Sequence, residues 1–434
     1  MATNRGAIAV ATGSGGPAVG SVSETRVVFV AAWVLALVFY FLQYSFRSAP
    51  GVMIPELRDA FRLTPMGITS VLGLYYYSYA FFAIVAGASL DRYGGKLPIG
   101  FGVSAVAVGC VLFGSGTITG AEWGRFLQGA GSGFAFPGAV YLATHAFSAR
   151  WLATAIGFTQ LAGMLGGFAG QFVVGPLVHG EMNWQAFWLH ASAVSALLGA
   201  IVLALLPGAE QRATTSIWSM FAPYKTVLTN PQSYLCGLVS GLMFMPTTIG
   251  NMVWGVPFRH DGLGFTMAEA VERSSMLPLG WVIGAPLPGY VADRLGRRKP
   301  VVMAGIAIML VYFLAIIFVP YDIPSFGGGL LFGIGSGAAM IPYTMIKEVN
   351  PDRVKGSAAG AMNFLVFSLS AVLGPMFGLV LVRLSGGHEL TLATFLHADW
   401  AGVGAIVLAF VLTLFLRETG SAASAPKPVA SATD

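Results

Sequence analysis

The sequence has few charged residues. Asp, Glu, Lys and Arg make up only 9% of its 434 residues, and 56% are hydrophobic. A soluble domain carries about 25% charged residues, so water cannot be the main solvent around this chain. The polar connections between its apolar runs are also short, which leaves no room for a soluble domain of ordinary size.

Cysteines, clustered metal ligands and nucleotide-binding loops are scarce as well. Cys110 and Cys236 each lie inside an apolar run, where a small buried packing residue is expected rather than a disulfide. The sequence contains no phosphate-cradling loop with Lys and no credible pair of nucleophile and base. Its net charge is +5, but no basic stripe for nucleic acid is present. We therefore expect no enzymatic activity, no metal, no cofactor and no nucleic-acid partner.

Long apolar runs account for most of the chain. A helix needs about 20 mostly apolar residues to cross a bilayer. Twelve runs of this kind centre near Leu37, Tyr77, Val106, Pro137, Gly166, Leu197, Leu242, Val282, Leu310, Ile334, Val372 and Val407. The sequence therefore predicts an all-α, polytopic membrane protein with twelve transmembrane helices.

A polar stretch at 208–232 divides six of these runs from the other six. We expect six-helix bundles at 26–207 and 233–417, joined by a cytoplasmic linker at 208–232. The ends at 1–25 and 418–434 are rich in small residues and should be disordered cytoplasmic tails. With an inside N-terminus, most basic residues fall in cytoplasmic connections. The expected location is a bacterial inner membrane, with the lipid bilayer around a monomer.

Two glycine patterns each occur twice. Gly-x3-Asp-Arg-x-Gly is found at 87–94 and again at 289–296. Gly-x-Gly-Ser-Gly is found at 129–133 and again at 333–337, at nearly the same interval. Two unrelated features that repeat in register indicate that one half of the chain arose by duplication.

The segment 87–96, between the second and third runs, resembles the signature loop of the major facilitator superfamily, and 289–298 repeats it. The resemblance implies two pseudo-symmetric bundles that rock about a central route. The glycine would let two helices approach closely, and Asp91 could cap a neighbouring helix N-terminus or pair with an arginine such as Arg150, which would latch the cytoplasmic side. A tight turn with an anchoring charge cluster is the alternative. On either interpretation the motif residues are gate elements rather than substrate ligands: Gly87, Asp91, Arg92, Arg150, Gly289, Asp293 and Arg294.

A second resemblance concerns the substrate. The segment from Arg47 to Pro55, followed by the aromatic run 75–79, is similar to the organic-anion branches of that superfamily, the anion:cation symporters and organophosphate antiporters. In these families an Arg eight residues before a Pro on helix 1 binds the anionic group, and Arg47 has this spacing. Segments 124–129 and 360–364 resemble the symporters' helices 4 and 11. The implied substrate is a small, carboxylate-like organic anion.

The chain departs from those families where they carry other charges. Phe46 and Ser132 stand where the symporters have acidic residues, and the stretch 235–258 lacks the basic residue that the antiporters place on helix 7. Glu269 and Glu272 are expected at the outer rim of the membrane. These departures favour exchange or facilitated movement over obligate proton symport.

Seven residues are candidates for substrate binding. Arg47 is the sole charged residue between positions 27 and 55, and a cation at membrane depth costs at least about 2.5 kcal/mol unless it faces water or a partner. Arg47 and Arg125 therefore either bind an anion or extend to the outer headgroups. Gln160 and Asn363 are amides in apolar helices, where they would serve as ligands or as contacts between helices. Tyr44, Tyr75 and Tyr79 could surround a substrate or simply pack.

These observations predict a secondary active or facilitative transporter of a small organic anion that works by alternating access. A transporter of a neutral or cationic solute, such as a peptide, metal complex or drug, is an alternative within the same class. A transporter-like membrane sensor is an alternative from another class, because some organophosphate-type relatives sense their substrate.

Overall fold

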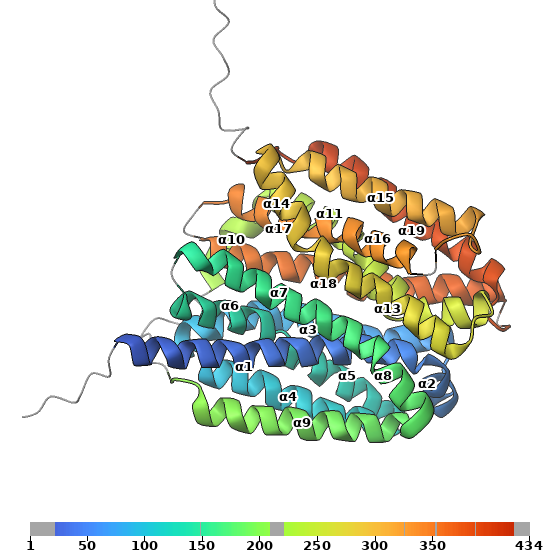
Figure 1. Cartoon of the computed structure of the whole chain (residues 1–434), viewed down its shortest axis with the longest axis horizontal. Helices are drawn as coiled ribbons and strands as arrows, with labels where there is room; N and C mark the ends of the chain where they lie inside the picture. The colour runs from blue at the N-terminus through green and yellow to red at the C-terminus, as the bar shows by residue number, and fades with distance from the viewer. Residues whose placement is uncertain are drawn as a thin grey trace, which may run out of the picture.

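The computed structural model describes residues 22–147, 149–208, 221–324, 326–351, 354–386 and 388–420, and these residues contain helices but no strand. The helices run side by side along the long axis of the molecule (Figure 1). The first half of the chain forms one side of this bundle and the second half forms the other. The all-α fold predicted from the apolar runs is therefore confirmed.

The first half consists of α1 Val22–Ser48, η1 Ala49–Val52, α2 Ile54–Phe61, α3 Pro65–Tyr93, α4 Lys96–Gly114, α5 Ile118–Ser132, α6 Ala135–Ala146, α7 Ala149–Phe172, α8 Val174–Pro176, η2 Leu177–Glu181 and α9 Trp184–Leu205. The second half begins with α10 Ala222–Leu228, α11 Pro231–Met245, η4 Pro246–Asn251, α12 Gly255–Pro257, η5 Phe258–Gly262, α13 Met267–Gly284 and α14 Pro286–Leu295. It continues with α15 Lys299–Phe318, α16 Gly327–Gly337, η6 Ala338–Met340, α17 Ile341–Glu348, α18 Lys355–Ser385 and α19 Leu392–Phe415.

Ten helices of the described part are long and apolar enough to cross a membrane. The fourth and eighth predicted runs are each divided instead, into α5 with α6 and into α13 with α14. Pro286 opens α14, and a proline at this position cannot continue the hydrogen-bond ladder of the helix before it. The first helix starts at Val22 rather than at residue 26. Most of the two predicted tails and residues 209–220 of the predicted linker lie outside the described residues.

The two ends of the bundle differ in what they carry. One end, here called the linker end, holds α10 and the turn between α14 and α15, beside which Gly420 lies (Figure 1, left). The other, called the distal end, holds η1, α2, η2 and η5 (Figure 1, right).

Glycines explain why helices within each half pack so closely. A Cβ atom at Gly129 would lie 2.1 Å from the carbonyl oxygen of Tyr75 on α3, and one at Gly337 would lie 1.9 Å from that of Gly284 on α13. Real atoms do not approach this closely, so a side chain at either position would push two helices apart. The Gly-x-Gly-Ser-Gly repeat is therefore a helix-packing element in both halves.

The other repeat places a glycine with a positive φ at the end of two helices. Gly94 follows α3 with a φ of +69°, and Gly296 follows α14 with a φ of +62°. Glycine adopts such angles without the steric cost that a Cβ atom would bring. Close approach was expected at the first glycine of the motif instead, but a Cβ at Gly289 would meet nothing within 4 Å, and one at Gly87 would meet the Tyr224 hydroxyl at 3.3 Å. In this conformation neither glycine is required for contact between helices.

The halves meet along two seams, where α3 packs against α18 and α7 packs against α13. At the distal end the seam is tight, because a Cβ at Gly51 would lie 2.0 Å from the carbonyl oxygen of Met252. Gln171 Nε2 also donates to the Asn251 carbonyl oxygen at 3.3 Å across the same seam. These contacts close the distal end.

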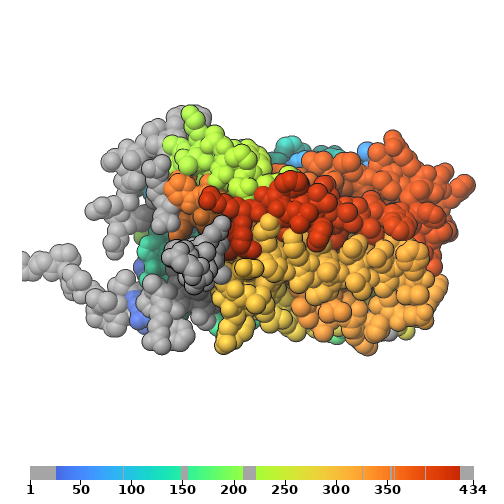
Figure 2. Space-filling model, turned by 90° about the horizontal axis from the view of Figure 1, so that it is seen from above, coloured from blue at the N-terminus to red at the C-terminus, as the bar shows by residue number. Residues whose placement is uncertain are grey.

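The outer surface of the bundle is apolar. Figure 2 shows the face formed largely by the second half of the chain, including α15 and α19. Large hydrophobic side chains are exposed on these two helices, among them Val311, Phe318, Val407, Leu408, Phe410, Val411, Leu414 and Phe415. Such a surface is suited to lipid chains rather than to water.

Candidate functional site

Arg47 lies in the last turn of α1 and is almost completely enclosed by protein, with 3% of its surface exposed. Its Nε donates to the Tyr75 hydroxyl at 3.2 Å, and its Nη2 donates to Gln43 Oε1 at 3.2 Å. The Tyr75 hydroxyl donates in turn to the same Gln43 oxygen at 2.7 Å. Arg47 therefore does not extend to the lipid headgroups, which was the alternative that the sequence left open.

Aromatic rings surround the Arg47 guanidinium. Its Cζ lies 4.2 Å from the ring centroid of Tyr44, 4.8 Å from that of Tyr79 and 5.0 Å from that of Tyr75. Phe367, on α18 in the other half, adds a further ring at 4.9 Å. Ring faces attract a cation, so this cage stabilises the charge without neutralising it.

Arg125 is a second enclosed cation, with 1% of its surface exposed. Its Nη1 donates to Gln128 Oε1 at 2.7 Å and to the Phe46 carbonyl oxygen at 3.2 Å. Its Cζ lies 4.7 Å from the ring centroid of Tyr75, so one tyrosine ring separates it from Arg47. Arg125 stands behind the cage rather than inside it.

Neither guanidinium has a carboxylate partner, since the ion pairs formed by the described residues all lie elsewhere. Arg47 Nη1, Gln43 Nε2 and Arg125 Nε are moreover buried without a hydrogen-bond acceptor among these residues. Unpaired buried donors and charges are costly. The site is thus rich in donors and positive charge and poor in acceptors.

A small central cavity of ≈ 20 Å³ lies beside the cage and between the halves. It is lined from the first half by Tyr40, Tyr44, Phe136, Gln160, Met164 and Tyr79, and from the second half by Phe244, Met340, Tyr343, Asn363 and Phe367. About 10–15 Å³ accommodates one water molecule, so the site is nearly closed in this conformation.

The two predicted amides face each other across this cavity from opposite halves. Gln160 Oε1 accepts from the Tyr40 hydroxyl at 2.7 Å, and Asn363 Oδ1 accepts from the Tyr343 hydroxyl at 2.9 Å. Both amides are therefore oriented by a tyrosine with the oxygen engaged, which leaves each NH2 group to serve as a donor. Gln160 Nε2 has Met340 Sδ at 3.6 Å, which is a weak acceptor.

The structure thus brings together six of the seven sequence candidates around the cage and cavity, with Arg125 one ring away. Tyr40, Tyr343 and Phe367 were not predicted. Tyr40 could have been found, since it stands one helical turn before Tyr44 on α1. Tyr343 and Phe367 carry no comparable signal, because they reach the site from the second half of the chain.

The signature loops lie at the linker end, away from the cavity. Asp293 pairs with Arg298, five residues later, and Arg298 Nη2 also donates to Glu348 Oε1 at 2.9 Å. Partial burial lowers the pKa of Arg298, but its hydrogen bonds to Glu348 and Asp293 outweigh this effect and raise the pKa above its usual value. All three residues belong to the second half, so this cluster joins α17 to the α14–α15 turn.

Two other arginines of the signature loops contact a neighbouring tyrosine ring. Arg294 lies over the Tyr290 ring at 5.2 Å, and Arg92 lies over the Tyr93 ring at 5.5 Å. The side chains of Asp91 and Arg150 are outside the described part, and so is their expected ion pair. The latch function of these loops therefore stays a prediction.

The family model of the Major Facilitator Superfamily matches residues 36–375 and 274–433. These matches cover well over half of the sequence. The chain belongs to the Major Facilitator Superfamily. It is accordingly a multi-pass membrane transporter of that superfamily, and the family predicted from the duplicated signature loop is confirmed.

Two relatives within the superfamily differ in the share of this chain that they match. Membrane sensor protein UhpC of Salmonella typhimurium is 26% identical over 306 residues, which is 63% of this chain and 66% of that protein. The probable sulfoacetate transporter SauU of Cupriavidus necator is 22% identical over 402 residues, which is 86% of this chain and 91% of that protein.

Among solved structures, a bacterial homologue of the human lysosomal transporter Spinster, in an inward-facing and unoccupied conformation, superposes with a TM-score of 0.71. The alignment covers 90% of this chain and 97% of that one at 15% identity. This likeness shows a shared fold and carries no information on the substrate.

Proposed function

We propose that this transporter carries a small, carboxylate-like organic anion by alternating access, and that Arg47 binds the anionic group. The observation that supports this most strongly is the set of unpaired donors, Arg47 Nη1 and Gln43 Nε2, beside a cavity without an acidic residue. A guanidinium binds a carboxylate through two parallel N–H···O bonds. An anion would supply both the charge and the acceptors that the site lacks.

The cavity wall suggests how the rest of the substrate is held. Gln160 and Asn363 would donate from opposite halves to polar groups of the solute, and Tyr44 and Tyr79 would pack against its carbon skeleton. Because ligands come from both halves, a bound solute would draw the halves together. Arg125 lies behind Tyr75 and would add attraction for negative charge without touching the solute.

The distribution of basic residues supports one orientation, because they concentrate in the connections expected on the cytoplasmic side. We infer that the linker end faces the cytoplasm of a bacterium, so that both termini are cytoplasmic and the conformation seen here is closed toward the outside. In the opposite state, Gly87 and Gly289 would become the sites of close helix contact. The name of the relative SauU points to a small organic acid, and this is consistent with the proposed substrate class.

Ligand-induced thermal stabilisation of the purified protein tests this proposal. The panel should contain mono- and dicarboxylates, sulfonates, phosphate esters, neutral sugars, peptides and organic cations, measured on wild type, Arg47→Gln and Arg47→Lys. The exposed Arg383 on α18 provides a control, Arg383→Gln. Stabilisation by anions that is lost in Arg47→Gln and weakened in Arg47→Lys is the expected result. Stabilisation by neutral or cationic compounds alone, unchanged in Arg47→Gln, would contradict the anion assignment.

Sensing is a second candidate, because one relative is named a membrane sensor protein. A sensor would bind the same anion through the same cage. Uptake of the stabilising anion into proteoliposomes separates the two functions, since a sensor would bind the anion and transport none of it.

A further inference from the structure

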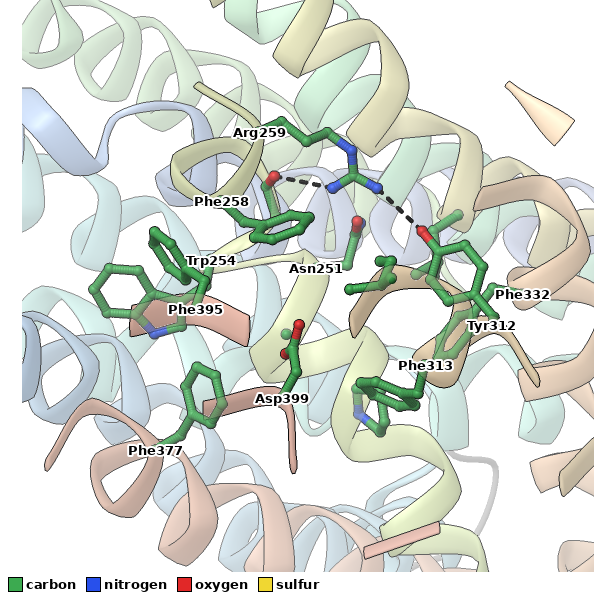
Figure 3. Close-up of a pocket in the computed structure, with 15 residues that line it drawn as sticks. Asn251, Trp254, Phe258, Arg259, Tyr312, Phe313, Phe332, Phe377, Phe395 and Asp399 are labelled. Atoms are coloured by element: carbon green, nitrogen blue, oxygen red, sulfur yellow. Dashed lines mark hydrogen bonds between the residues drawn. The ribbon is translucent and has the colours of Figure 1, made fainter. Parts of the chain in front are cut away.

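A second cavity lies inside the second half of the chain near its distal end. Its volume is ≈ 60 Å³, which is larger than the central cavity, and seven of its fifteen lining residues are aromatic. Figure 3 shows two charged residues at this cavity, with Arg259 from η5 on one wall and Asp399 from α19 opposite. The sequence reasoning singled out neither residue.

Asp399 is an acidic residue at membrane depth. It lies eight residues after Thr391, the N-cap of α19, or about 12 Å along the helix. A carboxylate is costly there unless it is paired or hydrated, and acids within spanning helices are generally functional. Among the described residues Asp399 has neither a hydrogen bond nor an ion pair, although a cation stands across the cavity.

Arg259 is engaged with other groups. Its Nη1 donates to the Gly255 carbonyl oxygen at 2.9 Å and to Ser274 Oγ at 3.2 Å, and its Nη2 reaches the Tyr312 hydroxyl at 3.5 Å. The guanidinium thus joins α12 to α13 and to Tyr312, and Asp399 is not among its partners. This arrangement fits an Asp399 that is uncharged, since a carboxylate would compete for the guanidinium.

These contacts lead directly to the closed seam between the halves. Asn251, one turn before Gly255, donates from Nδ2 to the Ser274 carbonyl oxygen at 2.9 Å and lies 3.4 Å from Gln171 Oε1 in the first half. Its carbonyl oxygen accepts from Gln171 Nε2. Arg259 and Asn251 therefore fix the same segment of α13, and Asn251 carries the contact across the seam.

We propose that Asp399 is a proton-binding site and that its protonation holds the distal end closed. In this step a carboxylate oxygen takes a proton from hydronium in the cavity, which leaves a neutral carboxylic acid and one water molecule. Arg259 then stays on Gly255 and Ser274. Loss of the proton to cavity water restores the carboxylate, which attracts Arg259 across the cavity. The contacts of Arg259 with Gly255 and Ser274 then weaken, and so does the segment that holds Asn251 against Gln171.

The cavity adjoins another one near the distal surface. This neighbouring cavity of ≈ 40 Å³ shares four lining residues with it, namely Phe258, Arg259, Tyr312 and Ile316. The neighbour is lined further by Arg273 and by Tyr321, which is 65% exposed. In the proposed step, protons enter through this neighbouring cavity and pass the Arg259 side chain.

Few other titratable groups face Asp399. Arg259 comes from η5 and Tyr312 from α15, whereas α18 and α16 contribute Phe377 and Phe332. On η5, His260 and Asp261 pair with each other at 2.6 Å outside the cavity lining. On α19, His397 is exposed and contacts the Ala393 carbonyl oxygen. A pH effect at this site is thus expected to come from Asp399.

Distance measurements between two spin labels test the proposal in the full-length protein in lipid nanodiscs, without substrate. Labels at Asp59→Cys and Glu272→Cys report on the distal end, because both positions are exposed and lie in opposite halves. The native Cys110 and Cys236 are fully buried and need no replacement. In wild type the short distance should dominate at pH 5, and a longer one should grow in by pH 9.

The variants give opposite results if the proposal holds. Asp399→Asn, which mimics the protonated acid, should keep the short distance at both pH values. Arg259→Gln should show the longer distance at both, because the contacts to Gly255 and Ser274 are lost. Glu389→Gln removes an exposed acid from the preceding loop and should respond to pH as wild type does.

The proposal is overturned if wild type shows one distance at pH 5 and pH 9, or if Asp399→Asn responds to pH in full. If Asp399→Asn does not fold, the proposal is also overturned by a short distance between the two spin labels in Arg259→Gln at pH 5. Because no substrate is present, neither outcome bears on the role proposed for Arg47.

Discussion

Arg47 and Phe367 meet across the seam between the two halves, with the guanidinium carbon 4.9 Å from the ring centroid. Phe367 also lies edge-on to Tyr79, at 4.5 Å between centroids, so a ring from the second half completes a cage built by the first. The cation is fixed in one half and covered by the other. Separation of the halves at this level would therefore expose Arg47 to the central route.

Substitution of Phe367 should cost more stability than an equivalent change elsewhere on α18. A cation–π contact contributes about 0.5–2 kcal/mol, so Phe367→Leu should exceed Phe377→Leu in destabilisation by about that amount. Phe377 is a buried phenylalanine of the same helix that lines the second cavity. Thermal unfolding of both variants checks this, and the excess should shrink in an Arg47→Gln background, where only the ring contact with Tyr79 and its neighbours remains. An excess of the same size in that background would remove the cation–π explanation.

The Tyr75 hydroxyl is expected to be the main fixed support of Arg47. Tyr75→Phe leaves Arg47 Nε without its acceptor, and an unsatisfied buried donor costs about 1–3 kcal/mol. Tyr77, on the same helix, has 46% of its surface exposed, so Tyr77→Phe is the matched control and should change stability by less than about 0.5 kcal/mol. Urea or thermal unfolding in one detergent compares the two. Equal effects would show that the hydroxyl does not hold the guanidinium.

Two glycines of the second half should respond oppositely to alanine. At Gly337 the new Cβ would lie 1.9 Å from the Gly284 carbonyl oxygen, and such overpacking costs about 1–3 kcal/mol or more. At Gly289 it would meet nothing within 4 Å, so Gly289→Ala should be neutral or stabilise its helix by about 0.5–1 kcal/mol. The fraction of protein that stays monodisperse after heating measures the stability of both variants. If Gly289→Ala is stable but transports slowly, the glycine is needed for helix contact in the conformation that is closed at the linker end.

The Arg298 cluster is expected to stabilise the linker end of the second half electrostatically. Arg298→Gln should lower stability by about 0.5–1 kcal/mol, because Glu348 and Asp293 lose their shared partner. Arg294→Gln alters an exposed neighbour in the same turn and should change little. Screening at 1 M salt reduces the reach of such charges to about 3 Å, so the difference between the variants should shrink. A difference that is the same at low and high salt would assign it to packing.

The sequence was a good guide to helices and a partial guide to the site. Apolar runs identify spans because the thickness of the bilayer sets their length. A lone Arg47 in such a run must either have a function there or extend to the headgroups. Its burial depends on Phe367, 320 residues away in the chain, and no local pattern reports that contact. The Arg47 site was therefore predictable as a residue but not as a cage.

Asp399 illustrates the limit more sharply. Asp399 lies near the start of the last apolar run, and Arg259 lies at the end of another. From the sequence, both residues would be placed at the membrane surface. Their common cavity arises from the packing of η5, α15 and α19, which sequence periodicity does not determine. Asp293 has a local partner, Arg298, which fits the tight turn with an anchoring charge cluster, one of the two interpretations of this motif.

Among the described residues, no carboxylate pairs with Arg47 or Arg125, so we expect the protein without substrate to be sensitive to voltage. Two positive charges without a counter-charge lie within the electric field of the membrane, and moving one charge through it changes the free energy by about 2.3 kcal/mol per 100 mV. The monoanion proposed as substrate would cancel one of the two charges. On that proposal, the membrane potential acts more strongly on the return of the unloaded carrier than on the delivery of the anion.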